Sequence, residues 1–225
     1  MRPKPLQGNS DQLTMRILHG TTTVGVVCSD GIVLGTDRRA TSGYYIAHKR
    51  VKKIFKIDDY VAATMAGVVA DAQKVLDRVR MEVKLYKYST GEKMSIRAIA
   101  TFLSNVLFGS RIYPYVIHAI VAGVDGSGPD MYALDWFGTL TREKYIATGS
   151  GSPIALGVLE DSLVEGMSVK EVVPIVVRAI NSAIRRDPGS GEGIDLVVIT
   201  KSEFKEYTDD EIAKIIKSIR REPRR

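Results

Sequence analysis

The segment His19-Gly20-Thr21-Thr22-Thr23-Val24-Gly25 contains residue types that could form a reactive nucleophile. A threonine hydroxyl attacks carbonyls poorly unless a base lies beside it. An α-amino group at a chain end has a pKa of about 7.7–8.0, whereas a peptide nitrogen is not basic. Cleavage before Thr21 would therefore give one residue both nucleophile and base. Gly20 suits the scissile position because it lacks a side chain and tolerates a bent backbone. The alternative interpretation is an ordinary strand start, where threonine is common.

A second candidate pair is Asp37, in Gly35-Thr36-Asp37-Arg38-Arg39, with Lys53, in Val51-Lys52-Lys53-Ile54-Phe55. A fixed cation beside a threonine would lower the pKa of its hydroxyl and stabilise the attacking oxygen. The carboxylate would hold that cation in place. The alternative is two solvated charges at strand ends.

Three glycine-containing segments could supply backbone N–H groups to a ligand or a reacting oxygen. In Thr64-Met65-Ala66-Gly67 the glycine N–H could form part of an oxyanion hole. The segments at 149–153 (GSGSP) and 186–191 (RDPGSG) border predicted helices and raise the possibility of a phosphate- or nucleotide-binding module. Neither has the Lys-Ser/Thr ending of a P-loop, and turns at helix ends are the commoner alternative.

Metal and serine-hydrolase chemistry find no support in the sequence. His19, His48 and His118 are far apart, no His or Cys pair has zinc spacing, and no G-x-S-x-G motif is present. We therefore expect neither a metal nor another cofactor. The single Cys28 lies in an apolar run and is interpreted as a buried, inert thiol. A lone cysteine fits a reducing compartment, and we expect the cytoplasm.

Composition restricts the class of protein. The 225 residues are 44% apolar and 26% charged, which is typical of a globular domain and excludes collagen-like, disordered and disulfide-rich classes. No apolar run approaches the roughly 20 residues of a membrane span, so we expect no membrane association. The net charge of +6 resides in the two ends, because residues 21–216 balance to zero. A basic surface for nucleic acid is therefore disfavoured.

The hydrophobic pattern predicts blocks of strands alternating with pairs of helices. Strands are expected at 21–28, 32–36, 53–57, 60–65, 116–124, 131–135, 144–148 and 194–200, and helices at 68–86, 95–108, from Ser152, from Ser168 and from Thr208. Ser152 is expected to cap its helix, and Pro174 to kink the next helix or delay its start. This order is not that of a doubly wound sheet. It predicts an α+β fold, a four-layer αββα sandwich of two stacked antiparallel sheets covered by helix pairs.

Taken together, these segments resemble the catalytic β subunit of the archaeal-type proteasome, an N-terminal nucleophile hydrolase. The resemblance covers Thr21 to Thr200. It rests on the order and spacing of GTTTVG, GTDRRAT, HKRVKKIFKID, MAGVVADAQ, ATGSGSPIALGVLE and RDPGSGEGIDLVVIT. It implies residues 1–20 as a propeptide removed by autocleavage between Gly20 and Thr21, and residues 21–225 as one catalytic domain with a basic C-terminal tail.

The resemblance also implies roles for individual residues. Thr21 falls on the nucleophile, Asp37 and Lys53 on its acidic and basic partners, and Gly67 on the oxyanion glycine. The remaining catalytic positions fall on Ser150, Asp187 and Ser190, and those of the first specificity pocket on Ala40, Val51, Met65 and Val69. Because all four pocket residues are uncharged, cleavage after apolar residues is expected.

At the level of the particle, the resemblance implies stacked seven-membered rings of β subunits with separate α subunits outside them. It also implies a regulatory ATPase and unfolded polypeptides as substrates, which a threonine endopeptidase would cut to short peptides. A catalytically silent ring subunit remains the alternative within this fold.

Overall fold

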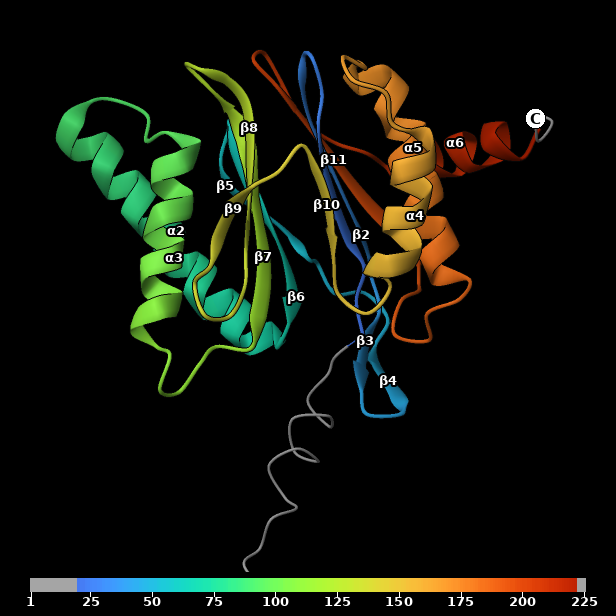
Figure 1. Ribbon diagram of the computed structural model, residues 1–225, viewed down its shortest axis with the longest axis horizontal. Helices are drawn as coiled ribbons and strands as arrows, with labels where there is room; N and C mark the ends of the chain where they lie inside the picture. Colours follow the sequence, from blue (N-terminus) through green and yellow to red (C-terminus); the bar gives the residue numbers. More distant parts are fainter. Residues whose placement is uncertain (1–19, 222–225) are drawn as a thin grey trace, which may run out of the picture.

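Two antiparallel sheets form the centre of the molecule (Figure 1). The structure is a computed structural model and describes residues 20–221. The first sheet has the order β10-β1-β2-β11-β12. Its strands are β10 (Tyr145–Thr148), β1 (Thr23–Val27), β2 (Gly31–Asp37), β11 (Ile194–Thr200) and β12 (Phe204–Glu206). The second has the order β5-β6-β7-β8-β9, with β5 (Ile54–Asp58), β6 (Val61–Gly67), β7 (Ile117–Asp125), β8 (Gly128–Leu134) and β9 (Leu140–Arg142).

Helices cover the outer face of each sheet. Helices α2 (Val69–Thr90) and α3 (Ile96–Gly109) lie against the second sheet, and α4 (Ser152–Ser162) and α5 (Val169–Ile184) lie against the first (Figure 1). Helix α6 (Asp209–Arg221) packs beside α5. The predicted αββα sandwich is confirmed, and the predicted strands and helices lie within a few residues of the observed ones.

The alternation of side chains along β2 explains why the two sheets stack. Ile32 and Leu34 point into the core between the sheets, whereas Val33 points into the core beneath α5. A strand covered on both faces reads as a continuous apolar run, as observed here. Burying side chains of this size contributes roughly 1.5–3 kcal/mol each, and this packing fixes the ends of the strands relative to each other.

The expected cap of α4 was wrong, and of the two effects expected of Pro174, a kink or a delayed start, the delayed start is excluded. Helix α4 begins at Ser152 and its N-cap is Gly151, so Ser152 is not the cap. Helix α5 begins directly after its capping box of Ser168 and Glu171 and contains Pro174 in its interior, so its start is not delayed. The two side chains of the box satisfy N–H groups of the first turn, which favours a start there despite the proline.

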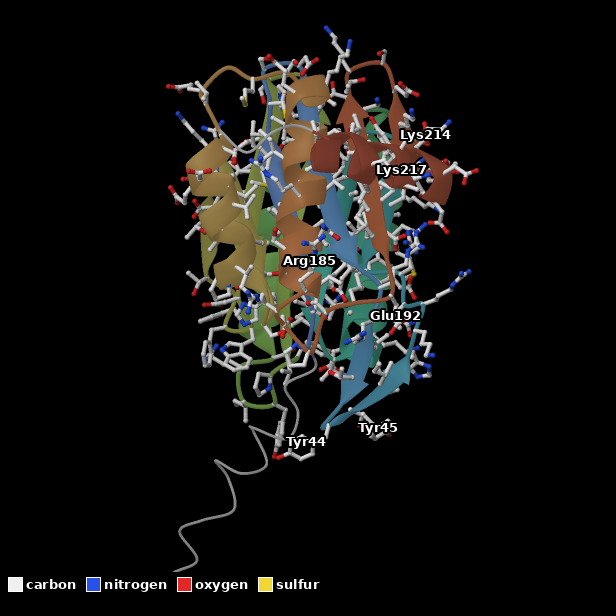
Figure 2. All side chains as sticks on the ribbon, turned by 90° about the vertical axis from the view of Figure 1, so that its right-hand side faces the viewer. Tyr44, Tyr45, Arg185, Glu192, Lys214 and Lys217 are labelled. Carbon is white, nitrogen blue, oxygen red and sulfur yellow. The ribbon has the colours of Figure 1, made fainter. Side chains whose placement is uncertain are left out.

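A two-stranded hairpin, β3 (Ala40–Ser42) with β4 (Tyr45–His48), was not predicted. It projects from the end of the sandwich, with Tyr44 and Tyr45 exposed at its tip (Figure 2). Its strands are only three and four residues long, which gives too little sequence for a period to be detected.

The predicted leader, apart from Gly20, and the end of the basic tail fall on residues 1–19 and 222–225, which lie outside the described part of the chain. Between these limits, every helix is too short or too polar to cross a membrane.

Candidate active site

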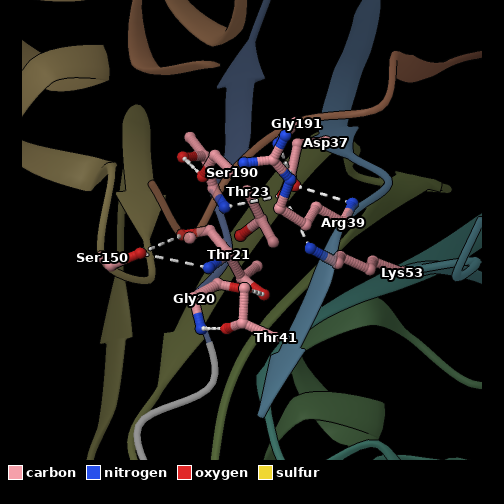
Figure 3. A network of polar contacts seen from close by, with 12 residues as sticks. Gly20, Thr21, Thr23, Asp37, Arg39, Thr41, Lys53, Ser150, Ser190 and Gly191 are labelled. Carbon is pink, nitrogen blue, oxygen red and sulfur yellow. Dashed lines mark hydrogen bonds and ion pairs between the residues drawn. The ribbon is translucent and has the colours of Figure 1, made fainter. Parts of the chain in front are cut away.

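Thr21 lies at the entrance to β1, between Ser150 on one side and Lys53 on the other (Figure 3). It is 3% exposed. Its hydroxyl donates a hydrogen bond of 2.6 Å to the carbonyl oxygen of Gly20, and its backbone N–H donates one of 3.1 Å to Ser150 Oγ. The hydroxyl is therefore held against the carbonyl group that the sequence marked for cleavage.

Asp37 and Lys53 form a buried ion pair beside Thr21. Lys53 Nζ is 2.7 Å from Asp37 Oδ1, and the two side chains are 5% and 0% exposed. The same carboxylate accepts backbone N–H groups from Thr22, Arg39 and Gly191, each at 2.9 Å. A buried charge is stable when it is paired and fully hydrogen-bonded, as this one is.

The sheets explain how these two residues meet. The β1–β2 register aligns Thr23 with Thr36, which brings Thr22 next to Asp37 at the end of β2. The carbonyl of Lys53 accepts the N–H of Met65 at the start of β5, where the second sheet faces the first. Burial lowers the pKa of Lys53 below its ordinary value, although the charge of Asp37 opposes the shift.

A second polar network connects Thr21 to the loop after α5. Asp187 Oδ2 accepts hydrogen bonds of 2.6 Å from the hydroxyls of Ser150 and Ser190. Ser150 in turn accepts the Thr21 N–H, and Ser190 lies 2.7 Å from Thr22 Oγ1. Both serine hydroxyls donate their hydrogen to Asp187. Each serine oxygen can therefore accept a hydrogen bond from Thr21 or Thr22.

Gly67 lies at the end of β6 and lines a narrow cavity together with Thr21 and Lys53. The four predicted pocket residues, Ala40, Val51, Met65 and Val69, line the same cavity. Gly67 has φ +128°, and a Cβ there would come within 2.1 Å of the Val116 carbonyl oxygen. Only glycine fits this position, because its backbone passes close to the Val116 carbonyl.

The structure gives a further reason for glycine at position 20. A Cβ on Gly20 would lie 2.0 Å from Gly189 Cα, so close approach of two backbone segments excludes a side chain. The φ of Gly20 lies outside the left-handed region, so no left-handed conformation requires glycine here.

Sequence reasoning missed two residues of the site. Thr41 Oγ1 accepts the N–H of Gly20 at 2.9 Å. Arg39 donates to the Pro188 carbonyl at 2.9 Å and pairs with Glu192 at 3.1 Å, so it holds the loop that carries Asp187 and Ser190. Both belong to the GTDRRAT segment, but a charge or hydroxyl near a strand end has no distinguishing spacing of its own.

The two glycine-rich loops use their N–H groups internally. Gly151 N–H donates to the Thr21 carbonyl at 3.3 Å, Gly189 N–H to Asp187 at 3.1 Å and Gly191 N–H to Asp37 at 2.9 Å. These donors are not available for a phosphate. Among residues 20–221, no group of three His, Cys, Asp or Glu side chains could hold a metal ion.

Comparison with known proteins identifies the family to which this chain belongs. The profile of the family described as proteasome subunit matches residues 17–199. The chain belongs to the proteasome subunit family. A Pyrobaculum calidifontis protein named proteasome subunit beta 1 is 55% identical over 184 residues, 81% of this chain and 92% of that protein. The Methanosarcina barkeri proteasome subunit beta is 50% identical over 205 residues, 91% of this chain and 97% of that protein.

Membership of this proteasome family implies assembly with other subunits into a particle. The Ignicoccus hospitalis protein named proteasome subunit beta 2 is 51% identical over 192 residues, 85% of this chain and 90% of that protein. The relatives therefore place the chain among proteasome β subunits across nearly its whole described length.

Proposed function

We propose that this proteasome subunit is a catalytic one, a threonine endopeptidase that degrades unfolded polypeptides to short peptides. One observation carries the proposal. The hydroxyl of Thr21 is hydrogen-bonded to the carbonyl oxygen of Gly20. The backbone nitrogen of Thr21, which cleavage would release as an amine, is hydrogen-bonded to Ser150. The groups that the chemistry needs thus surround a single peptide bond.

The first proposed step is removal of residues 1–20. The Thr21 hydroxyl attacks the Gly20 carbonyl carbon and its proton passes to the departing nitrogen, so that a C–O bond replaces the C–N bond. The resulting ester is hydrolysed by water, which leaves Thr21 with a free amine. The Lys53 ammonium, held by Asp37, favours the negative charge that develops on the attacking oxygen.

The second proposed step is hydrolysis of substrate peptides. The Thr21 amine, acting through a water, accepts the hydroxyl proton as the oxygen attacks a substrate carbonyl. The N–H of Gly67 stabilises the oxyanion, the leaving amine takes up the proton, and water hydrolyses the acyl-enzyme. Ser150, Asp187 and Ser190 position the amine through the network of 2.6 Å hydrogen bonds.

The cavity beside Thr21 supports a preference for cleavage after apolar residues. Ala40, Val51, Met65 and Val69 offer only apolar side chains to it. A charged side chain entering it would lose hydration without gaining a partner from these four residues. Comparable rates on acidic, basic and apolar fluorogenic peptides would contradict this preference.

The proposal includes the particle around the subunit. We propose stacked seven-membered β rings between outer rings of α subunits, with a regulatory ATPase supplying unfolded chains, in the cytoplasm. Enclosure keeps an unspecific protease away from folded proteins. The buried, unpaired thiol of Cys28 is compatible with that reducing compartment.

The alternatives are weaker. A silent ring subunit would not need the complete set of Thr21, Asp37, Lys53 and Ser150 around one carbonyl. A phosphate- or nucleotide-binding module would need free N–H donors in loops whose donors are already bonded.

N-terminal sequencing and intact-mass measurement of the chain after assembly with α subunits test the proposal. The wild-type chain is expected to begin at Thr21, and the particle to hydrolyse peptides. Thr21→Ala is expected to retain the leader and to lose hydrolysis, whereas Thr21→Ser, which keeps a hydroxyl, should retain both steps in part. Hydrolysis by particles whose chains still begin at Met1 would refute the mechanism. Assembly with the leader retained and no hydrolysis would support the silent subunit.

A further inference from the structure

A second, larger cavity of about 620 Å³ opens beside the candidate active site. It lies at the start of β7 and the end of β8, next to the loop that joins β10 to α4. Its walls include Val116, His118, Leu134, Asp135, Trp136 and Ile146. None of these residues was assigned a role by the sequence or by the mechanism above.

This cavity lies on the opposite side of Thr21 from the narrow one. Lys53 lines the narrow cavity and Ser150 lines the larger one, and Figure 3 shows these two residues on opposite sides of Thr21. Gly67 lines both cavities. A substrate peptide that occupies the narrow cavity and runs past the Thr21 hydroxyl therefore continues towards the larger cavity.

The position of Gly20 gives the direction of that chain. Gly20 carries the carbonyl that Thr21 contacts, and it lines the narrow cavity. The residue that supplies the acyl group thus belongs on the narrow side. The residue that follows the scissile bond, which leaves as the free amine, then belongs on the side of Ser150.

The walls of the larger cavity have a definite chemistry. Leu134, Val116 and Ile146 are apolar, and Trp136 lies with its ring 5.7 Å from that of His118, tilted by 57°. Aromatic rings at such distances and angles pack well against further rings. The cavity is large enough for one bulky side chain of a peptide.

Asp135 contributes a negative charge to a wall that also carries His118 and threonine and serine hydroxyls. Its Oδ1 accepts the N–H groups of Phe137 and Thr139, each at 2.9 Å. Partial burial disfavours the ionised form, but hydrogen bonds from Thr139 and Phe137 outweigh it and hold the pKa of Asp135 below its ordinary value. The carboxylate therefore remains charged at neutral pH and repels acidic side chains.

We propose that the larger cavity receives the side chain that follows the scissile bond and selects a bulky apolar or aromatic residue over an acidic one. This inference rests on the proposed peptidase function and extends it to the leaving-group side of the substrate.

The test uses assembled particles and internally quenched peptides that differ only in the residue after the cleaved bond, namely Phe, Leu, Gly or Asp. For the wild type, kcat/KM is expected to be roughly tenfold higher with Phe than with Gly, and lowest with Asp. Cleavage positions are checked by mass spectrometry of the products. Equal rates on all four peptides would overturn the inference.

Two variants locate the selectivity. Thr141→Trp places a large ring in the cavity, because Thr141 lines it, and should bring the ratio of kcat/KM on the Phe peptide to kcat/KM on the Gly peptide close to one. Asp135→Asn should raise the ratio of kcat/KM on the Asp peptide to kcat/KM on the Phe peptide several-fold. The matched control Thr101→Trp alters an exposed threonine of α3 outside both cavities and should change no ratio.

The outcomes separate this inference from the proposed function. If the wild-type particle cleaves no peptide and retains its leader, the peptidase function itself fails. If it cleaves all peptides, but Thr141→Trp and Thr101→Trp behave alike, only the assignment of the larger cavity fails.

Discussion

Replacing Lys53 by alanine tests the centre of the proposed chemistry. The substitution removes an ammonium group that is buried beside Thr21 and lies 2.7 Å from Asp37 Oδ1. It leaves the Asp37 carboxylate with three backbone N–H donors and no counter-charge. Two effects follow, one on catalysis and one on stability.

The effects on catalysis and on stability should be similar in size. Removal of one group that stabilises a developing oxyanion typically lowers kcat by about 10²–10³-fold, or roughly 2.7–4 kcal/mol. Breaking a buried ion pair costs about 3–5 kcal/mol of stability. Because the three N–H donors remain, we expect a loss near the lower end of that range.

The assay must separate self-cleavage from peptide hydrolysis. Lys53→Ala is therefore prepared in the full chain, where intact mass reports leader removal, and as a chain released from a cleavable fusion so that it begins at Thr21. For the second form, kcat is measured on an apolar fluorogenic peptide after assembly. Lys56→Ala is the matched control, since Lys56 is 43% exposed and pairs with Asp59 at the surface. Thermal unfolding of both particles checks that the variant is folded.

A loss of less than about tenfold in kcat, which is roughly 1.4 kcal/mol of barrier, would refute the role given to Lys53. The residue would then be a structural partner of Asp37 and nothing more. The same conclusion would follow if the leaderless variant were fully active and only self-cleavage failed, because the proposed charge acts on the same oxygen in both steps.

Three further perturbations test other parts of the site and fold. Gly20→Ala should slow leader removal by about 10²-fold, because its Cβ would meet Gly189 Cα at 2.0 Å and displace the scissile carbonyl; a mass time course that matches the wild type would exclude this steric argument. Arg39→Ala should lower kcat by roughly tenfold with little change in KM, and Arg39→Lys should not restore it because lysine lacks the planar fork; recovery by lysine would indicate that charge alone matters. The hydrogen bond from Lys205 and those from Thr208 lower the pKa of Glu211 to about 2 from 4.5, so its contribution to docking of α6 is present above pH 4.5 and is lost as the pH falls towards 2. Hydrogen exchange of α6 amides at pH 6 and pH 3, compared with Glu211→Gln, measures this effect, and an equal pH response in both chains would contradict it.

Much of the fold could be predicted because its signals are local. The strands around Val24 and Leu34 are continuous apolar runs, and the capping box of Ser168 and Glu171 specifies where α5 begins. The end of helix α2 was predicted at Tyr86, but the helix continues to Thr90 and is followed by Gly91 in the left-handed conformation. The paired helices between strand blocks then restrict the architecture to stacked antiparallel sheets.

The candidate site was only partly accessible from the sequence. Thr21, Asp37 and Lys53 stand out because their residue types and their places at strand ends suggest chemistry. Arg39 and Thr41 do not, because their roles depend on a loop more than 140 residues away in one case and on the Gly20 amide in the other.

The sequence by itself determined the order of the main strands and of the helices, the residues able to become a nucleophile with its partners, and the absence of a P-loop or a zinc motif. Only the tertiary structure decided that the backbone of Gly20 lies too close to that of Gly189 for a side chain, and that N–H groups of the two glycine-rich loops are already hydrogen-bonded. It also decided that the larger cavity lies on the opposite side of Thr21 from the narrow one. The physical reason is that periodicity and capping act between near neighbours, whereas these features arise where β1, β6 and the loops after β10 and α5 converge from distant parts of the chain.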